Sequence, residues 1–408
     1  MRTTLLALAL LLVPALVRAD EQARKQALAL NEVAVRAYGE GRYEDALSGF
    51  RQAYNLEPRD PTILRNLAFC LIRLGDGLLL AGEPARALRD YGEAGRLLPD
   101  DWVPRFREGL ALYRAQRERE AATLLERALS GPNAGRVDGW ELLALARYRL
   151  GENAEAIRAW EKAIELDPKN ERLAKDLARA RREEKVEGQL FLDQSTPHFA
   201  IKYDGARETA LGKRVGQLLE EAYQVVGAQL GRYPTHELSV VIYPSKSFRA
   251  LTGSHAWVAA LYDGKIRIPG GGLATAPLAE QRRVLRHEYA HAVIHELGGA
   301  RVPPWLHEGL AQLAEGRTRA DARQALSGQP LPDLAALSRP FAQVQDAAAA
   351  RVLYAAACDW VCALEARGGQ GSLAALLERL GKGETLDAAC RGLFSASPAE
   401  LHAAWAAR

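Results

Sequence analysis

The residues of this chain that are best suited to chemistry lie in one short stretch, LRHEYAHAVIHELGG. It contains His287, His291 and His295 at intervals of four, and Glu288 and Glu296 each directly follow a histidine. Residues four apart lie about 40° apart on a helix, so the first two imidazoles can reach a single ion. Glu288 is rotated about 100° from His287, where it can serve as the general base for a zinc-activated water. The H-E-x-x-H pattern therefore predicts a zinc site with its own base.

A catalytic zinc of this kind needs a third protein ligand and one open position. Glu308 follows His291 by seventeen positions, within PPWLHEGLAQLAEG. A second helix is predicted to begin after the two prolines, because proline suits the first turn of a helix. Gly309 and Ala311 should let this helix lie close against the first. Three ligands with an adjacent glutamate leave a position for water, which disfavours a purely structural zinc.

Four further polar residues near the motif receive other predictions. His295 lies about 80° round the helix from the first ligand, which favours a partly buried or supporting histidine over a ligand. Glu296 should be solvated. His307 should point away from the metal, although it could line the cleft. Gln312, one turn after Glu308, could orient a ligand imidazole.

A metzincin would need glycine three residues after the second histidine and another histidine three residues further on. Ile294 and Leu297 stand at those two positions, so the sequence excludes that class.

The elements that precede the motif begin with four internal repeats. Each carries an alanine, an aromatic residue or leucine, a second alanine and a closing proline in the same order. The four sets are Ala46, Phe50, Ala53, Pro58; Ala87, Tyr91, Ala94, Pro99; Ala121, Leu125, Ala128, Pro132; and Ala156, Trp160, Ala163, Pro168. These residues resemble the tetratricopeptide repeat, a helix–turn–helix of about 34 residues.

Turn residues support this resemblance. Gly41, Gly82 and Gly151 stand between the two helices of their repeats, whereas Gln116 stands there in the third. The charged segment KNERLAKDLARARREEKVEG is predicted to be a solvated capping helix and linker. We place the all-α solenoid at residues 20–187. It would offer a concave groove to a protein or peptide partner, or act as a rigid spacer.

The pattern changes after the repeats. FAIKY and LSVVIY are strand-like runs separated by a long amphipathic helix, and WVAALYDGKIRIP predicts a hairpin with Asp263-Gly264 as its two-residue turn. We expect an α+β domain at residues 188–318. The alanine- and leucine-rich remainder predicts a helical subdomain at residues 319–408.

The combination of HEYAH with PPWLHEGLA resembles the thermolysin-like gluzincin metallopeptidases, in particular the peptidase MA-like domains, which are often attached to tetratricopeptide repeats. The resemblance runs from about Thr196 to the end of the chain and includes HFAIKYDG and ALYDGKIRIP. It implies a zincin-like fold in which His287, His291 and Glu308 bind one Zn²⁺ ion and Glu288 is the base.

An oxyanion that forms beside the zinc needs one more donor. Tyr354, in LYAAACDWV, is the candidate that the resemblance suggests, and a tyrosine of the core is the alternative. The edge of the WVAALY strand could hold an extended peptide by strand addition, which favours peptide substrates.

The chain begins with MRTTLLALALLLVPALVRAD, a basic start, a short apolar run and a small-residue end. This pattern predicts a secretory signal peptide at residues 1–19, cleaved after Ala19. The run is short for a membrane span, which needs about twenty residues. An uncleaved anchor is the alternative. The sequence therefore predicts a periplasmic or secreted protein with no stable span after cleavage.

Composition sets the remaining bounds. A chain of 408 residues with 48% hydrophobic and 26% charged residues suits two or three globular domains. The formal charge of +3 argues against a nucleic-acid partner. Of the four cysteines, Cys390 could pair with Cys358 or Cys362, and Cys70 reads as a buried core residue.

Two functions fit the sequence. The first is an exported zinc metallopeptidase that hydrolyses peptide bonds and uses its repeats to bind a protein or peptide. The second is a non-catalytic scaffold or assembly protein, built on the repeats, whose peptidase-like domain binds zinc or peptides without turnover.

Overall fold

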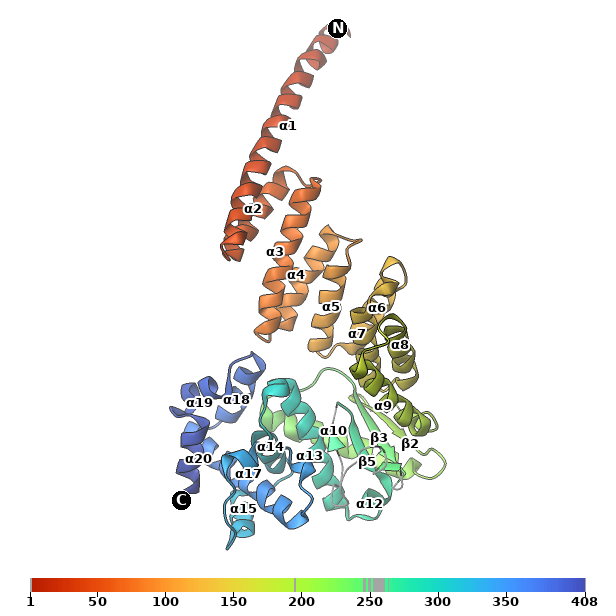
Figure 1. The fold of residues 1–408 in the computed structure, drawn as a ribbon, viewed down its shortest axis with the longest axis vertical. Helices are drawn as coiled ribbons and strands as arrows, with labels where there is room; N and C mark the ends of the chain where they lie inside the picture. The colour runs from red at the N-terminus through yellow and green to blue at the C-terminus, as the bar shows by residue number, and fades with distance from the viewer. Residues whose placement is uncertain are drawn as a thin grey trace. The chain divides into compact units, whose positions relative to one another are not determined.

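The computed structural model describes residues 2–193, 196–244, 247–248, 251, 261–262 and 264–407. The chain divides into two compact units, Met1–Gly135 and Arg136–Arg408 (Figure 1). The structure is mostly helical, and one small sheet lies in the second unit.

The first unit consists of antiparallel helix pairs. Its elements are α1 (Arg2–Gly39), α2 (Tyr43–Leu56), α3 (Pro61–Leu80), α4 (Pro84–Leu97), α5 (Trp102–Arg114), α6 (Glu118–Leu129) and a short 3₁₀ turn, η1 (Pro132–Gly135). Five of the six predicted alanine positions in this unit are fully buried, as with Ala46 and Ala87, which lets paired helices approach closely, and Ala128 of the third repeat is half-buried. Gly41 and Gly82 have φ angles of +78° and +75°, and Gln116 adopts the same left-handed conformation at +57°. The third repeat therefore keeps its turn without glycine.

The second unit begins with the fourth repeat, α7 (Val137–Arg149) and α8 (Asn153–Leu166), followed by α9 (Glu171–Glu187). The unit thus starts inside the segment 20–187 that we assigned to the solenoid. The prediction of a solvated α9 is wrong for one face, because Glu183 and Glu187 are buried there. Their partners lie in the sheet.

The sheet has five strands in the order β1-β2-β3-β5-β4. The strands are β1 (Phe191–Asp193), β2 (Phe199–Tyr203), β3 (Leu238–Tyr243), β4 (Leu261–Tyr262) and β5 (Ile266–Pro269). β2, β3 and β5 are parallel, and β1 and β4 are antiparallel at the two edges. The predicted strands FAIKY and LSVVIY coincide with β2 and β3, and the long helix between them is α10 (Thr209–Leu230).

The hairpin of β4 and β5 confirms one prediction and corrects another. The strands pair antiparallel, with Tyr262 opposite Ile266. Three residues rather than two therefore connect them. Asp263 and the first part of the predicted strand, Trp257 to Ala260, lie outside the described residues, and Gly264 has a φ angle of +101°.

The remaining helices surround one core. They are α12 (Gly270–Thr275), α13 (Leu278–Gly298), η2 (Gly299–Arg301), α14 (Pro304–Ala314), α15 (Arg319–Leu326), α16 (Leu334–Leu337), η3 (Phe341–Gln343), α17 (Ala347–Gly368), α18 (Ser372–Gly381), α19 (Leu386–Phe394) and α20 (Pro398–Ala406). One face of the sheet, α10, α13, α14 and α17 share this core. Figure 1 shows the ribbons of these elements within the second unit.

The position of α14 is fixed by α17. The rings of Trp305 and Trp360 lie 4.0 Å apart, and both side chains are fully buried. A Cβ atom on Gly309 would lie 2.6 Å from the backbone oxygen of Ala357. The prediction that Gly309 faces the first helix is therefore wrong, because its missing side chain makes room for α17.

Among the described residues, α17 is the helix whose length and composition would allow it to cross a membrane. Its buried Trp360 and Val361 belong to the core shared with α14, so here it packs as the central helix of a folded domain. The pairing that the sequence left open for Cys390 is not formed. Cys358, Cys362 and Cys390 are all free; Cys358 and Cys390 are buried as small apolar side chains, and Cys362 is half-buried.

Candidate metal centre

Two helices carry the predicted ligands. α13 begins after Pro277 with Glu280 in its first turn and ends at Gly299, whose φ angle is +62°. α14 begins at Pro304, as predicted, because proline needs no hydrogen bond in the first turn. The two helices bring the motif of the first against the glutamate of the second.

The three predicted ligands converge on one point. Glu308 Oε2 lies 3.4 Å from His287 Nε2 and 3.5 Å from His291 Nε2. One ligand atom from each residue lies within 4.8 Å of the others, which is close enough for a single metal ion to bind all three. The two imidazole rings are perpendicular, with centroids 4.7 Å apart.

The outer nitrogen of each imidazole has a polar partner that the sequence predictions missed. His287 Nδ1 lies 3.0 Å from Glu315 Oε2. His291 Nδ1 lies 2.7 Å from His307 Nδ1. Partners of this kind fix the ring orientation and the tautomer that leaves Nε2 free to bind a metal.

The sequence held a signal for both partners. Glu315 follows Glu308 by seven residues, about two helical turns, so both lie on the same face of the helix. His307 directly precedes Glu308 and was expected to point away. We assigned the supporting role to Gln312, but Glu315 occupies that place at His287.

Glu288 lies beside the ligands in a dry environment. Its side chain is 6% exposed, and its Oε2 atom makes no hydrogen bond among the described residues. Burial raises the pKa of Glu288 to about 7, and the negative charge of Glu308 adds to the effect. A carboxylate held in this way is ready to accept a proton from a neighbouring molecule.

The two ligand histidines have opposite electrostatic surroundings. Burial lowers the pKa of His287, but the carboxylates of Glu308 and Glu315 outweigh it and raise the value to about 10. Burial lowers the pKa of His291 well below its usual range and that of His307 to about 4. The carboxylates of Glu308 and Glu315 thus favour positive charge beside His287, which a bound divalent cation would supply, and burial keeps His291 and His307 neutral.

Tyr354 reaches the same site from α17. Its ring lies 6.4 Å from that of His287 and packs edge-on against Phe341 at 5.3 Å. Burial, followed by the charges of Glu308 and Glu288, raises the pKa of Tyr354, so its hydroxyl keeps its proton. The structure thus brings all five predicted site residues together.

Farther along α13, one prediction is wrong. Glu296 is half-buried rather than solvated, and it accepts a hydrogen bond from Arg232 Nε at 2.8 Å. His295 is partly buried, as expected, and its ring lies 6.2 Å from that of Tyr262 on β4. His295 therefore lies at the point where β4 packs against α13.

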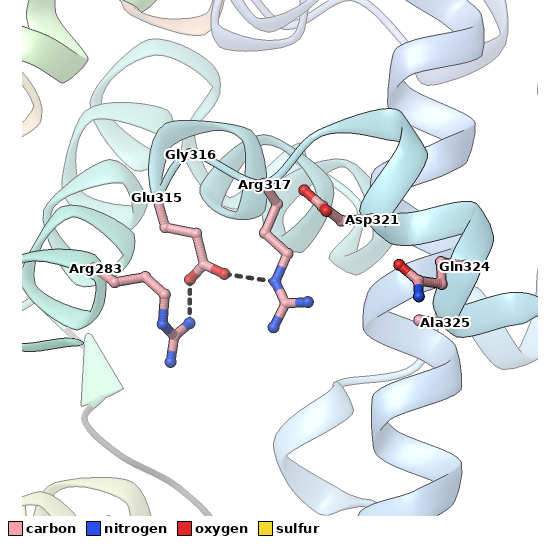
Figure 2. A pocket seen from close by; sticks show the side chains of 7 residues that line it. All are labelled: Arg283, Glu315, Gly316, Arg317, Asp321, Gln324 and Ala325. Carbon is pink, nitrogen blue, oxygen red and sulfur yellow. Dashed lines mark hydrogen bonds and ion pairs between the residues drawn. The ribbon is translucent and has the colours of Figure 1, made fainter. Parts of the chain in front are cut away.

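A cavity of about 430 Å³ is lined by Glu315 together with Arg283 and Arg317 (Figure 2). Arg283 Nη1 donates to Glu315 Oε2 at 2.8 Å, and Arg317 Nε donates to Oε1 at 3.1 Å. Burial alone would raise the pKa of Glu315, but His287 and the two arginines lower it. The carboxylate thus stays ionised, with Oε2 shared between Arg283 and the His287 imidazole and Oε1 bound to Arg317.

The donor set fits a metal ion. Two imidazole nitrogens face one carboxylate oxygen, and Glu308 Oε2 is buried without a hydrogen bond among the described residues. A buried carboxylate oxygen in this state needs a partner, and a divalent cation between the three atoms supplies one. Two histidines and one glutamate are the donor set that catalytic zinc sites use.

Family comparison agrees with the geometry. Residues 226–408 match the model of the peptidase MA superfamily, and residues 137–170 match the tetratricopeptide repeat. The chain carries a peptidase MA superfamily domain. The metal centre on α13 and α14 and the tyrosine on α17 all lie inside this peptidase MA domain.

Solved structures resemble the helical part. They include MamA from Desulfovibrio magneticus RS-1, at 22% identity and a TM-score of 0.32 over 39% of this chain and 86% of that one. PilF of Pseudomonas aeruginosa matches at 21% identity and a TM-score of 0.29 over 41% and 71%. A thermophilic tetratricopeptide-repeat protein of Thermus thermophilus matches at 22% and 0.23 over 38% and 98%. At these scores the likenesses carry no functional argument.

Changing Glu315 to alanine should weaken metal binding, because His287 then loses the carboxylate that orients its ring. We expect the affinity for a divalent metal to fall by about 10- to 100-fold in competition with a chelator. Glu280→Ala is the matched control, since it also removes a carboxylate from Arg283 but contacts no histidine. Equal affinities in the two variants would show that Glu315 does not support the site.

Proposed function

We propose that this protein is an exported zinc metallopeptidase that hydrolyses peptide bonds. One observation carries the proposal. Within a peptidase MA domain, the Nε2 atoms of His287 and His291 and a carboxylate oxygen of Glu308 converge beside the buried carboxylate of Glu288. A site that only stabilised the fold would have no use for an unpaired carboxylate next to an open coordination position.

Each residue then has one task. His287, His291 and Glu308 would hold one zinc ion, which, when bound, acidifies a water molecule and polarises the substrate carbonyl. Glu288 would take the proton from that water and return it to the leaving amine. Glu315 and His307 hold the two imidazoles in the orientation that keeps their Nε2 atoms inward.

Tyr354 would supply a hydrogen-bond donor to the oxyanion. Its hydroxyl keeps its proton in this environment, and its ring lies beside His287 on a different helix from both sets of ligands. A donor placed on a packed core helix needs no rearrangement when negative charge develops.

The peptide would lie along β4. This strand is at the edge of the sheet and passes α13, where Tyr262 meets His295 one turn after His291. A strand at the edge of a sheet can take up an extended peptide by strand addition. This geometry favours peptides over small esters, and the repeats would bind a protein partner or part of a larger substrate.

Glu288→Gln should abolish hydrolysis and leave the metal in place, because the amide cannot accept the proton and no ligand is changed. We expect turnover of a peptide library to fall at least 100-fold with metal content unaltered. Glu296→Gln, on the same helix but bound to Arg232, is the control and should remain active.

Two outcomes would count against this mechanism. Activity retained by Glu288→Gln would exclude this residue as the base. A wild-type protein that binds zinc yet cleaves no peptide would favour the scaffold function instead, with the peptidase MA domain holding zinc or peptides without turnover.

Tyr354→Phe should lower kcat by about 100-fold and leave KM nearly unchanged, because an oxyanion donor acts only in the transition state. Steady-state kinetics on one cleaved peptide would measure this. Tyr203→Phe removes a hydroxyl that contacts Asp193 instead and should have little effect. An unchanged kcat in Tyr354→Phe would make this residue an ordinary tyrosine of the core.

Export should remove the first nineteen residues, so that the mature chain begins at Asp20. Intact-mass measurement of the protein recovered from the cell envelope or medium tests this directly. Ala19→Arg should block processing, because the cleavage position requires a small residue. A full-length mass for the wild type in that fraction would indicate an uncleaved anchor.

A further inference from the structure

Two cations, Lys265 directly before β5 and Arg267 within it, lie on the face of the sheet that points away from the main core. Ile266 and Ile268 alternate with Lys265 and Arg267, and the isoleucines lie in the core with α10 and α13. Such alternation usually places the charged residues in water. Here Lys265 and Arg267 are each only 1% exposed.

The fourth repeat and α9 bury these cations. Arg267 donates to Glu183 at 3.1 Å and to Glu187 at 3.3 Å, and Lys265 Nζ lies 3.6 Å and 3.5 Å from the same two carboxylates. Tyr148 on α7 donates to Glu183 at 2.8 Å and accepts from Arg267 at 2.9 Å. The charges balance, two against two.

Neutral groups complete the network. Asn153 on α8 accepts from Lys265 at 2.8 Å and donates to Glu187 at 2.8 Å. Tyr243 on β3 donates to Glu187 and accepts from Arg267. Buried charges are tolerated only when they are paired and hydrogen-bonded in this way, and such networks specify one arrangement more than they add stability.

A second contact fixes the distance between the fourth repeat and the strands. The turn between α7 and α8 passes so close to β3 that a Cβ atom on Gly151 would lie 2.7 Å from Ser239 Oγ. The carbonyl oxygen of Gly151 also accepts a hydrogen bond from Lys202 on β2. The fourth repeat and α9 therefore contact the sheet at two places. One is the network at β5, and the other is the Gly151 turn against β2 and β3.

β5 connects this network to the metal centre. Arg267 is paired with Leu261 on β4, and Ile266 is paired with Tyr262. Tyr262 contacts His295, one turn after the ligand His291. A shift of β5 along its own axis would move β4 past the metal-binding helix by the same amount.

We propose that Lys265 and Arg267 are positioning residues that set the register of the substrate-binding edge. Their network with α7, α8 and α9 clamps β5, and β5 carries β4. The fourth repeat and α9 then help to position the substrate-binding strand of the peptidase and are not a separate binding module. This inference rests on the proposed function, in which β4 holds the peptide.

The experiment uses the full-length protein with Tyr148→Phe, which removes one hydroxyl from the network and changes no charge. Lys265→Met is the stronger variant, and Lys265→Met with Glu183→Gln restores the charge balance. Arg158→Met on α8 is the control, because its ion pair with Glu155 is exposed. KM and kcat are measured on a long peptide and on a dipeptide amide, together with zinc affinity.

We expect KM for the long peptide to rise about tenfold in Tyr148→Phe. This is the effect of losing one hydrogen bond from the network that holds β5 and β4 in place. Values of kcat, zinc affinity and KM for the dipeptide amide should stay as in the wild type. The charge-balanced double variant should recover part of the loss seen in Lys265→Met. A lowered melting temperature with unchanged KM, or a parallel fall of kcat and zinc affinity, would overturn the proposal.

Peptide binding without turnover separates this inference from the proposed function. Fluorescence anisotropy of a labelled long peptide is measured on Glu288→Gln with and without Tyr148→Phe. Weaker binding in the double variant supports the positioning role even if the wild type cleaves nothing. Equal binding overturns it even if hydrolysis is established.

Discussion

The geometry of the metal centre depends on how α14 packs beside α13. His287 and His291 lie on one helix, so helical spacing alone brings them together. Glu308 comes from α14, and its Oε2 atom lies 3.4 Å and 3.5 Å from the Nε2 atoms of the two histidines. Two contacts with α17 fix the position of α14. Trp305 stacks on Trp360, and Gly309 lets the backbone of α17 come into contact. The ligand geometry is therefore a product of core packing, since no loop lies between Glu308 and the residues that anchor it.

The ligand set was predictable because short-range rules determine it. Helical spacing put His287 and His291 on one face and turned His295 aside, and the prolines before α14 marked where the third ligand begins. Tyr354 was predictable only through resemblance to a family, since nothing within α17 distinguishes it from a core tyrosine. The supporting residues Glu315 and His307 required the crossing of the two helices, although their positions on α14 already placed them near Glu308.

Two of the errors share one physical cause, which is a partner distant in sequence. Glu296 was predicted to be solvated on its own helix, but Arg232, 64 residues earlier, donates to it. The helix α9 was also predicted to be solvated, yet Glu183 on it accepts from Arg267, 84 residues later. Helical periodicity shows which residues share a face. It carries no information about whether another part of the chain with matching charges covers that face, and here β5 covers one face of α9.

The charged sequence of α9 also has a consequence for synthesis. The repeats leave the ribosome before the sheet, and domains generally fold in that order. Until β5 is made, Glu183 and Glu187 can face water and give the growing stack a polar end, as the last repeat of a solenoid requires. The arrival of Lys265 and Arg267 then turns the same carboxylates into an interior contact. The same helix can thus form a polar end of the unfinished chain and later an interior contact with the sheet of the peptidase MA domain.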